Sequence, residues 1–343
     1  MNINAYLNTL SSNCRTLPIV ILHVTDGCNL RCITCSYRNA LPNELSLPEI
    51  IRLAERLKDF GLRNIVFSGG EPLMRRDFPD ICAAFAGKGI KQTLLTNGLL
   101  LDKRLPEIEQ YFSEIIVSID GPNDEVHNGI RGIDTFGLIV KGVKKAIGLS
   151  GKRTVSVRTV IQKKNFRYIM DMVKFARLVG VSRISFLAAD VFSDSFGRHA
   201  RGLVASSKEI MLDEEETHEF RTIVERMSSE CAEDFQTRLI SESPEKLYHL
   251  VQYYEALIGK SPFPRNHCNA PMVSTVITST GMLQPCFFLP PFANIRDGEI
   301  QSLLNRESIR SVRQQVRAYE PEQCKTCVCT LNMSPVRALL GRF

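Results

Sequence analysis

A regular alternation of strand and helix patterns, running from Pro18 to about Ala188, is the feature of this sequence that most restricts its fold. Apolar, β-branched segments alternate there with amphipathic stretches that carry helix-capping signals, such as the capping box Ser46-Leu-Pro-Glu49. Strands are expected at 19–25, 64–67, 91–96, 114–119, 154–161 and 183–188, and helices at 47–60, 77–88, 105–111, 136–149 and 166–179. This succession predicts an α/β fold in which outer helices cover parallel strands, and right-handed crossovers curl the sheet into a barrel or part of one.

Polar or glycine-containing turns follow four of the expected strands. They are the loop Cys28–Cys35, Gly69-Gly70-Glu71-Pro72, Asn97-Gly98 and Asp120-Gly121. The C-terminal ends of parallel strands lie at one edge of a sheet or barrel, and ligands bind there. The last three are ordinary turn sequences when each is taken alone, so it is their shared position that predicts a site.

The chain has 343 residues, which favours about two domains. We divide it into an N-terminal extension (1–17), a barrel core (18–188), a helical linker region (189–265) and a small cysteine-rich domain (266–343). The linker region combines a Ser/Gly-rich loop at 193–207 with two long amphipathic stretches.

Composition and charge exclude several classes of protein. With 44% hydrophobic and 23% charged residues, the chain resembles an ordinary globular protein. No apolar run approaches the roughly 20 residues of a membrane span, and the polar N-terminus lacks the apolar core of a signal peptide. We therefore expect a cytoplasmic protein with no membrane span. The net charge of +6 is modest and forms no dense basic stripe, so no nucleic-acid partner is expected.

The cysteines indicate metal chemistry. There are eleven, and in a reducing compartment grouped cysteines indicate metal ligands rather than disulfides. Cys28, Cys32 and Cys35 have the spacing C-x3-C-x2-C. Three thiolates on one loop can hold three corners of a cubane iron–sulfur cluster and leave the fourth iron open. Zinc is a competing interpretation, although structural zinc usually takes four ligands in C-x2-C pairs. Buried free cysteines are a third.

With this motif and three others in the expected order, the segment from Pro18 to about Ala188 resembles the radical S-adenosylmethionine (SAM) superfamily. Ser68-Gly-Gly-Glu-Pro72 is similar to the family's GGE motif. Leu95-Thr-Asn-Gly98 and Ser118-Ile-Asp-Gly121 resemble its third and fourth strand ends. The resemblance implies a partial (β/α)6 TIM-like barrel that binds a [4Fe-4S] cluster through the three cysteines, and SAM at the open iron.

The resemblance also implies a set of SAM contacts at these strand ends. Glu71 suits the ammonium group of SAM, because an ionised carboxylate only accepts hydrogen bonds. Ser118 and Asp120 suit the ribose hydroxyls, and Arg158 suits the SAM carboxylate, which a guanidinium can bind with two hydrogen bonds. The full expected set is Gly69, Gly70, Glu71, Asn97, Ser118, Asp120 and Arg158.

Other residues of the barrel segment carry weaker expectations. The family often has an aromatic residue before the third cysteine, but here that residue is Thr34, and Tyr37 is the alternative ring for adenine. His127 and Arg131 resemble a subgroup whose members carry extra clusters. We expect His23, in the first strand, to be an interior residue with its hydrogen bonds satisfied.

The second cysteine group resembles the twitch form of the SPASM extension found in some radical SAM enzymes. Cys268 and Cys286 flank an expected hairpin, and Cys324-x2-Cys327 follows. The resemblance implies that these four hold one auxiliary [4Fe-4S] cluster, with Cys329 as a spare or alternative ligand. Four cysteines ending in C-x2-C also fit a structural zinc site.

Together these features predict a radical SAM enzyme. It would cleave SAM reductively to methionine and a 5′-deoxyadenosyl radical, which takes hydrogen from an unidentified substrate. An auxiliary cluster near the substrate favours a two-electron oxidation in which that cluster accepts the remaining electron. The alternatives are a redox-neutral isomerisation, epimerisation or carbon–carbon bond formation, peptide modification with a separate recognition partner, and an iron–sulfur electron-transfer or metal-scaffold protein.

The expected partners are an electron donor such as flavodoxin or ferredoxin, and a small-molecule, lipid or peptide substrate. Only 17 residues precede Pro18, which favours a small molecule, lipid or cofactor precursor over a peptide. The apolar residues of Phe287–Phe292 are candidates for lining a substrate pocket, and the core of the small domain is the competing interpretation.

Overall fold

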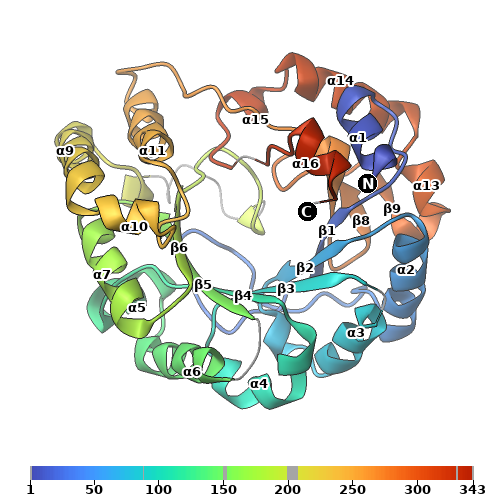
Figure 1. The fold of residues 1–343 in the computed structure, drawn as a ribbon, viewed down its shortest axis with the longest axis horizontal. Coiled ribbons are helices and arrows are strands. Elements are labelled where there is room, and N and C mark those ends of the chain that lie inside the picture. Colours follow the sequence, from blue (N-terminus) through green and yellow to red (C-terminus); the bar gives the residue numbers. More distant parts are fainter. Residues whose placement is uncertain (1, 88, 150–152, 199–207, 330, 342–343) are drawn as a thin grey trace.

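The computed structural model describes residues 2–87, 89–149, 153–198, 208–329 and 331–341. In this part of the chain one sheet has nine strands in the order β6-β5-β4-β3-β2-β1-β7-β8-β9. The first six strands in sequence pair in parallel, and the sheet curves around an interior without closing (Figure 1). The predicted α/β class and partial barrel are therefore confirmed.

Strands and outer helices alternate along the barrel segment. The parallel strands are β1 (Ile19–Thr25), β2 (Asn64–Gly69), β3 (Lys91–Thr96), β4 (Glu114–Ser118), β5 (Thr154–Ile161) and β6 (Arg183–Ala188). The helices outside them are α2 (Leu47–Asp59), α3 (Phe78–Phe85), α4 (Leu101–Ile108), α6 (Phe136–Gly148) and α7 (Ile169–Val179) (Figure 1). Short 3-10 helices occupy Pro72–Met74, Glu109–Tyr111 and Phe166–Tyr168.

Three details differ from the sequence expectation. Helix α4 begins four residues earlier than expected, at Leu101. Lys88, which was expected to end the helix that is now α3, lies outside the described residues. A further helix, α5 (Asp124–Arg131), stands between β4 and α6. Its N-cap Asn123 and its left-handed C-cap Gly132 are ordinary helix boundaries that the strand-and-helix pattern did not reveal.

The two faces of the barrel sheet differ in burial. In β2, Ile65 and Phe67 are fully buried, and Phe67 packs edge-on against Phe78 of α3. Val66 and Ser68, which alternate with them, are only half-buried. Because successive side chains of a strand point to opposite faces, the core lies between sheet and helices, and the inner face of the sheet stays partly exposed.

One end of the barrel is covered by three helices that are distant in sequence. They are α1 (Ile3–Leu10), α12 (Ala270–Val273) and α16 (Pro335–Leu339). Ala5, Met272 and Ala338, one from each helix, form a buried cluster with Ile19, the first residue of β1. This cluster occupies the N-terminal ends of the strands, so the predicted site residues lie at the opposite ends.

The cysteine-rich segment continues the barrel sheet. Strand β7 (Ser274–Ile277) pairs in parallel with β1, and β8 (Met282–Gln284) and β9 (Ala293–Asn294) follow in antiparallel pairing. Ile277 and Leu283 belong to the same hydrophobic core as the barrel strands. One sheet therefore includes strands from both sides of the predicted domain boundary at residue 266. The helices beyond are η5 (Ile295–Asp297), α13 (Ile300–Leu303), α14 (Glu307–Ala318) and α15 (Glu322–Lys325).

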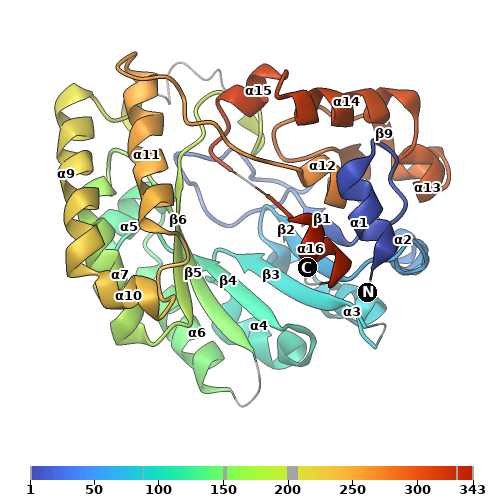
Figure 2. The same ribbon diagram turned by 45° about the horizontal axis from the view of Figure 1, so that its top comes forward.

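The predicted linker region packs against the other edge of the sheet. Its helices are α9 (Glu214–Glu230), α10 (Ala232–Gln236) and α11 (Pro244–Leu257), with α9 and α11 lying against each other beside β6 (Figure 2). The Tyr254 hydroxyl donates to the backbone oxygen of Ile161 at 2.6 Å. Of the Ser/Gly-rich loop expected at 193–207, residues 199–207 lie outside the described part of the chain. No helix among the described residues is long and apolar enough to cross a membrane.

Candidate functional site

The predicted cluster loop follows β1 at the C-terminal end of the sheet, and α5 holds it in place. The backbone N–H of Arg31 donates to the carbonyl of Arg131 at 3.0 Å, and that of Ile33 donates to the carbonyl of Ile130 at 3.1 Å. Gly132 closes α5 at φ +76°, and a Cβ there would lie 2.5 Å from the Arg31 oxygen. The last turn of α5 therefore positions the loop by its backbone, whatever the loop binds.

The three thiols of this loop lie in a shielded environment. Cys32 is buried, and Cys28 and Cys35 are half-buried. Burial raises the pKa of Cys28, and it raises the pKa of Cys35 to about 11. The free thiols of Cys28 and Cys35 therefore stay protonated at pH 7, and binding iron would release their protons. Among the described residues, no three Cys, His, Asp or Glu side chains converge as they would on a single ion.

Gly69 and Gly70 bring the end of β2 against the start of the cysteine loop. A Cβ on Gly70 would lie 2.2 Å from the Gly27 oxygen, and one on Gly69 would lie 2.3 Å from the Thr25 oxygen. The glycines are therefore required by close packing of backbone on backbone. Their predicted role in admitting SAM stays a prediction.

The Glu71 carboxylate faces protein groups. It is fully buried and accepts hydrogen bonds from Leu73 N (3.0 Å), Thr96 Oγ1 (2.8 Å) and Asn97 N (2.7 Å). Burial raises the pKa of Glu71 to about 7, although these hydrogen bonds lower it. In this arrangement Glu71 orients the turn after β3. A direct bond to the SAM ammonium, as predicted, would need one donor to be displaced or the remaining lone pair to be reached.

Asn97, at that turn, reaches the cysteine loop. Its Nδ2 donates to Asn29 Oδ1 at 2.7 Å and lies 3.9 Å from Cys28 Sγ. Asn97 is mostly buried. The structure thus links the ends of β2 and β3 to the first cysteine through Glu71 and Asn97.

Asp120 is also engaged within the protein. One carboxylate oxygen accepts from Val160 N at 2.8 Å, and the other pairs with Arg131 Nη2 at 2.7 Å. The side chain is almost completely buried. Its predicted contact with the SAM ribose competes with both interactions, so Asp120 is better placed to fix Arg131 than to meet a ligand directly.

Ser118 and Arg158 lie side by side on the inner face of the sheet. They are register partners in the β4–β5 pair, and Arg158 Nε donates to Ser185 Oγ at 3.2 Å. Both are half-buried. Their neighbouring positions agree with a shared ligand, and the individual roles predicted for them remain predictions.

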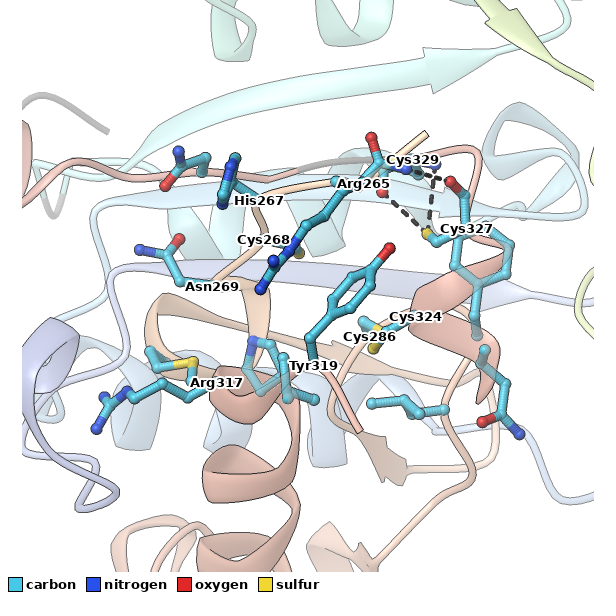
Figure 3. A pocket seen from close by; sticks show the side chains of 18 of the residues that line it. Arg265, His267, Cys268, Asn269, Cys286, Arg317, Tyr319, Cys324, Cys327 and Cys329 are labelled. Atoms are coloured by element: carbon cyan, nitrogen blue, oxygen red, sulfur yellow. Dashed lines mark hydrogen bonds between the residues drawn. The ribbon is translucent and has the colours of Figure 1, made fainter. Parts of the chain in front are cut away.

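The second cysteine group surrounds a cavity of about 320 Å³ (Figure 3). All five late cysteines line it: Cys268, Cys286, Cys324, Cys327 and Cys329. Burial raises the pKa of Cys286 to about 12 and that of Cys324 to about 11. Cys327 Sγ lies 2.9 Å from the Cys329 oxygen, so these two residues approach one corner of the cavity and either could supply the fourth ligand.

The charge of the cavity wall suits a cluster with four thiolate ligands, which is negatively charged. Arg265, His267 and Arg317 line the cavity, and its described lining includes no carboxylate. The guanidinium of Arg265 lies 5.2 Å from the centre of the Tyr319 ring, which orients it along the wall. Phe288 and Leu289, expected either to line a substrate pocket or to fill a core, line this same cavity.

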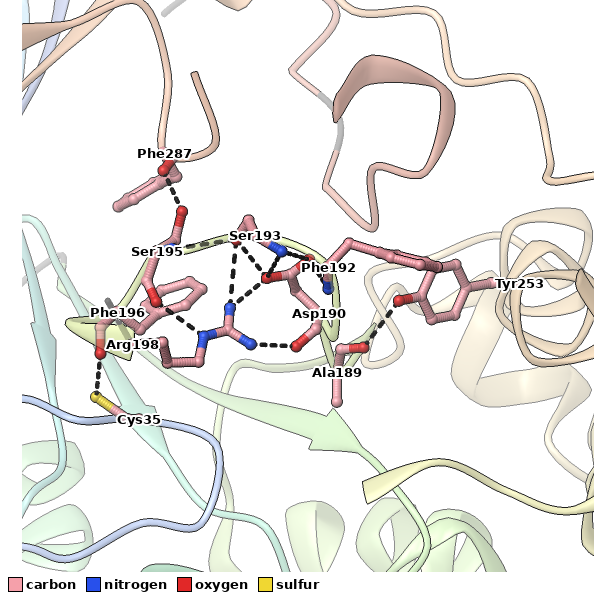
Figure 4. Close-up of polar contacts among 10 residues, drawn as sticks. All are labelled: Cys35, Ala189, Asp190, Phe192, Ser193, Ser195, Phe196, Arg198, Tyr253 and Phe287. Carbon is pink, nitrogen blue, oxygen red and sulfur yellow. Dashed lines mark hydrogen bonds and ion pairs between the residues drawn. The ribbon is translucent and has the colours of Figure 1, made fainter. Parts of the chain in front are cut away.

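A segment predicted only as linker joins the two cysteine sites (Figure 4). We call residues 190–198, after β6, the bridge segment. The Phe196 oxygen accepts from Ser36 N at 2.8 Å and lies 3.6 Å from Cys35 Sγ. One residue earlier, Ser195 Oγ donates to the backbone oxygen of Phe287, next to Cys286. The bridge segment therefore touches both cysteine loops.

A buried ion pair fixes the bridge segment. Arg198 pairs with Asp190, and its Nε donates to the Ser195 oxygen at 2.8 Å (Figure 4). Both charged side chains are more than nine-tenths buried. Sequence reasoning missed this pair, because two charged residues eight positions apart in a Ser/Gly-rich stretch give no local signal.

His23 does not meet the expectation of a satisfied interior residue. It is 95% buried, and neither ring nitrogen has a hydrogen-bond partner among the described residues. Burial lowers its pKa to about 4, so the ring is neutral. Its centre lies 6.1 Å from that of Tyr37 and 5.8 Å from that of Phe287. The expectation is wrong because aromatic rings, rather than hydrogen-bonding groups, surround His23. Tyr37, the predicted adenine ring, is edge-on to His23.

Two family models match this chain, one over each group of cysteines. Residues 22–176 match the model of the radical SAM superfamily, and residues 268–328 match that of the SPASM iron–sulfur cluster-binding domain. One relative is a Fe-coproporphyrin III synthase of Methanosarcina barkeri, 35% identical over 49% of this chain and 43% of the relative. Another is a GTP 3',8-cyclase of Haemophilus influenzae, 31% identical over 54% of this chain and 59% of the relative. The chain thus spans about half the length of these relatives.

Solved structures show the same fold. SuiB of Streptococcus suis bound to S-adenosylmethionine superposes with a TM-score of 0.64 at 16% identity, covering 97% of this chain and 78% of that one. Native anSMEcpe with bound AdoMet gives a TM-score of 0.63 at 20% identity, covering 91% of this chain and 88% of that one. At such low identity these likenesses concern the fold alone.

Proposed function

Because the chain belongs to the radical SAM superfamily and carries a SPASM domain, we propose that it is an enzyme that cleaves SAM reductively and abstracts hydrogen from its substrate. The family implies a SAM-binding [4Fe-4S] cluster, an auxiliary cluster and SAM. When bound, these groups supply the electron, the 5′-deoxyadenosyl radical and a second redox centre. The remaining chemistry is what this chain's own residues do around them.

The residues that would hold these groups come from several elements. Cys28, Cys32 and Cys35 would bind the barrel cluster, and Cys268, Cys286, Cys324 and Cys327 the auxiliary one, with Cys329 as the alternative to Cys327. The strand ends at Gly69, Gly70, Glu71, Asn97, Ser118, Asp120 and Arg158 would surround SAM. Glu71 and Asp120 act by orienting Asn97 and Arg131, as their hydrogen bonds indicate. Ser118 and Arg158 would meet the ligand from the inner face.

The contact of the bridge segment with both cysteine sites is the observation that carries the proposed reaction. Phe196 touches the barrel loop, and Ser195 touches the loop of Cys286. The two redox sites would then lie on either side of one ordered segment, within reach of a single substrate. Such an arrangement is compatible with a net two-electron oxidation, the outcome we favour, in which the auxiliary site takes the electron left after hydrogen abstraction.

The substrate class we favour is a small molecule or cofactor precursor. The relatives that match in sequence include a Fe-coproporphyrin III synthase, GTP 3',8-cyclases and an AdoMet-dependent heme synthase of Oleidesulfovibrio alaskensis. Those names describe tetrapyrrole or nucleotide chemistry. A peptide substrate remains the alternative, because SuiB was solved with a precursor peptide. An electron donor such as flavodoxin or ferredoxin completes the proposed system.

A redox-neutral reaction is the second candidate function. The name GTP 3',8-cyclase, shared by several relatives, describes a ring closure rather than an oxidation. The fold and the two cysteine sites serve either outcome.

The test is SAM turnover by the anaerobically reconstituted protein with dithionite. We expect 5′-deoxyadenosine and methionine in equal amounts. An iron-loaded protein that binds SAM without forming 5′-deoxyadenosine would overturn the proposal in favour of an electron-transfer or scaffold protein. Once a substrate is known, folded variants without the auxiliary cluster should still abstract hydrogen but should not form oxidised product. Normal amounts of oxidised product from them would show that the auxiliary cluster is not the electron acceptor. A product of the same oxidation state as the substrate would favour the redox-neutral reaction.

A further inference from the structure

We propose that Arg131 is a positioning residue that raises the reduction potential of the barrel cluster, by donating a charged hydrogen bond to the sulfur of Cys32. The inference rests on the proposed function only in requiring that the three-cysteine loop holds a cluster. Arg131 does not bind the cluster itself, and the C-x3-C-x2-C spacing does not identify Arg131 as part of the cluster site.

The geometry places the guanidinium between a carboxylate and a ligand sulfur. Arg131 Nη1 donates to Cys32 Sγ at 3.7 Å, and Nη2 donates to Asp120 Oδ2 at 2.7 Å. The other two sulfurs have different surroundings in the described structure. Cys28 Sγ lies near the neutral amide of Asn97, and Cys35 Sγ faces a carbonyl oxygen. Cys32 is thus the one ligand of the loop for which a charged donor is described.

The surrounding structure holds this guanidinium firmly. Asp120 is fixed by Val160 N, and its own N–H donates to His127 Nδ1 at 3.3 Å, one turn before Arg131 on α5. The Arg131 carbonyl accepts from Arg31 N in the cysteine loop. Backbone and side chain of Arg131 therefore both contact the loop, which leaves the guanidinium little freedom to move away from Cys32.

The charge state of the pair follows from its burial and its neighbours. A guanidinium is not deprotonated in proteins, so Arg131 stays charged, and it faces the Asp120 carboxylate at 2.7 Å. A buried pair of opposite charges is favourable only when the geometry is good and the remaining hydrogen bonds are made. The Asp120 carboxylate meets both conditions through Val160 N and Arg131, whereas the buried Nε of Arg131 has no hydrogen-bond partner among the described residues.

The effect on the cluster follows from electrostatics. Reduction adds one negative charge to the cluster, and net charge and hydrogen bonds to sulfur are among the factors that set its potential. A cation beside a ligand sulfur stabilises the reduced form, more strongly in a low-dielectric site than in water. Arg131 therefore makes the cluster easier to reduce, and Asp120 offsets part of that effect.

The experiment compares Arg131→Gln with the wild-type holoenzyme in a redox titration followed by electron paramagnetic resonance. The barrel signal is identified as the one that changes when SAM is added. Arg131→Gln should lower the midpoint potential by about 60–120 mV, a ten- to hundredfold shift in the one-electron equilibrium at about 59 mV per tenfold. Arg177→Gln is the matched control, because it breaks an Arg–Asp pair on the outer helices, and it should leave the potential unchanged.

An unchanged potential in an Arg131→Gln protein with full iron content would overturn the proposal. If that variant does not retain the cluster, Asp120→Asn and Arg131→Lys decide. Asp120→Asn should raise the potential, because the guanidinium charge is no longer offset, and Arg131→Lys should stay closer to wild type than to a lowered value. Two results would make Arg131 a purely structural residue. One is a wild-type potential in both the Asp120→Asn and the Arg131→Gln protein. The other is loss of the cluster from Arg131→Gln together with an unchanged potential in Asp120→Asn. Failure of the proposed function is a separate result, because it appears as missing 5′-deoxyadenosine whatever the potential.

Discussion

The two cysteine sites of this protein are built in different ways. The barrel loop has its cysteines within eight residues, and α5 and the ends of β2 and β3 hold it through backbone hydrogen bonds and buried side chains. The auxiliary cavity draws its five cysteines from residues 268–329, and the helices α12 and α15 beside them have only four residues each. We therefore expect protein contacts to preform the barrel site, and the auxiliary site to depend more on the group it binds.

The largest effect is expected from replacing all three barrel cysteines with alanine. The iron content should fall by half, from about eight to about four atoms per chain, and SAM cleavage should be abolished. The thermal unfolding midpoint should change little, because the loop keeps its hydrogen bonds to α5. Iron analysis, 5′-deoxyadenosine and circular dichroism check this. A variant that unfolds would contradict the view that the barrel site is preformed.

The opposite pattern is expected from Cys324→Ala combined with Cys327→Ala. About four irons should again be lost, but SAM should still be cleaved, while residues 266–343 become sensitive to limited proteolysis because metal binding and folding are coupled there. Cys231→Ala, which removes a buried cysteine outside both sites, is the control and should change neither iron nor proteolysis. Unaltered proteolysis in the double variant would remove the proposed contrast between the sites.

A smaller effect concerns Glu71, a buried carboxyl group of the barrel site. The described lining of the auxiliary cavity includes no carboxyl group. Its pKa is raised from 4.5 to about 7 by burial, so the folded state binds the proton more tightly than the unfolded state. Its contribution to stability is therefore complete below about pH 4.5 and is lost as the pH rises through about 7. The shift corresponds to about 3 kcal/mol.

The measurement is the free energy of unfolding of the apoprotein between pH 5 and pH 8, in wild type and in Glu71→Gln. The wild type should lose more stability over this range than the variant, which cannot titrate at this position. Parallel pH profiles would show that Glu71 is ionised throughout, and would return it to the list of direct ligand contacts.

The smallest effect tests how α5 supports the cysteine loop. Gly132 and Gly180 both end helices in the left-handed region, at φ +76° and +82°, but only Gly132 meets another segment, at the Arg31 oxygen. Gly180→Ala should cost about 1 kcal/mol of folding free energy, and Gly132→Ala about 2–3 kcal/mol because the contact adds overpacking. Chemical denaturation measures both. Equal losses of folding free energy would mean that the end of α5 is not in tight contact with the cysteine loop.

The features of the structure that could be predicted from the sequence were those with local sequence signals. Alternating patterns gave the six parallel strands, and short spacings gave the cysteine loop and the turns at Gly69, Asn97 and Asp120. The sequence also grouped Cys268, Cys286, Cys324 and Cys327, which the structure brings to one cavity.

The parts that could not be predicted depend on contacts between distant segments. The pairing of β7 with β1 joins residues at opposite ends of the chain, and the bridge segment reaches two loops from a stretch without helix or strand pattern. The direction in which a side chain points could not be predicted from the sequence either. The sequence placed Glu71 and Asp120 at the strand ends, but whether their carboxylates meet a ligand or the protein depends on burial and on donors such as Asn97 and Arg131.

The central claim is that both cysteine sites hold iron–sulfur clusters, and the most direct measurement is iron and zinc together in the reconstituted wild-type protein. On the stoichiometry of two four-iron cubanes, we predict about eight irons per chain and no stoichiometric zinc. About four irons with stoichiometric zinc would contradict the account, because the auxiliary cavity would then be a structural scaffold and could not accept an electron.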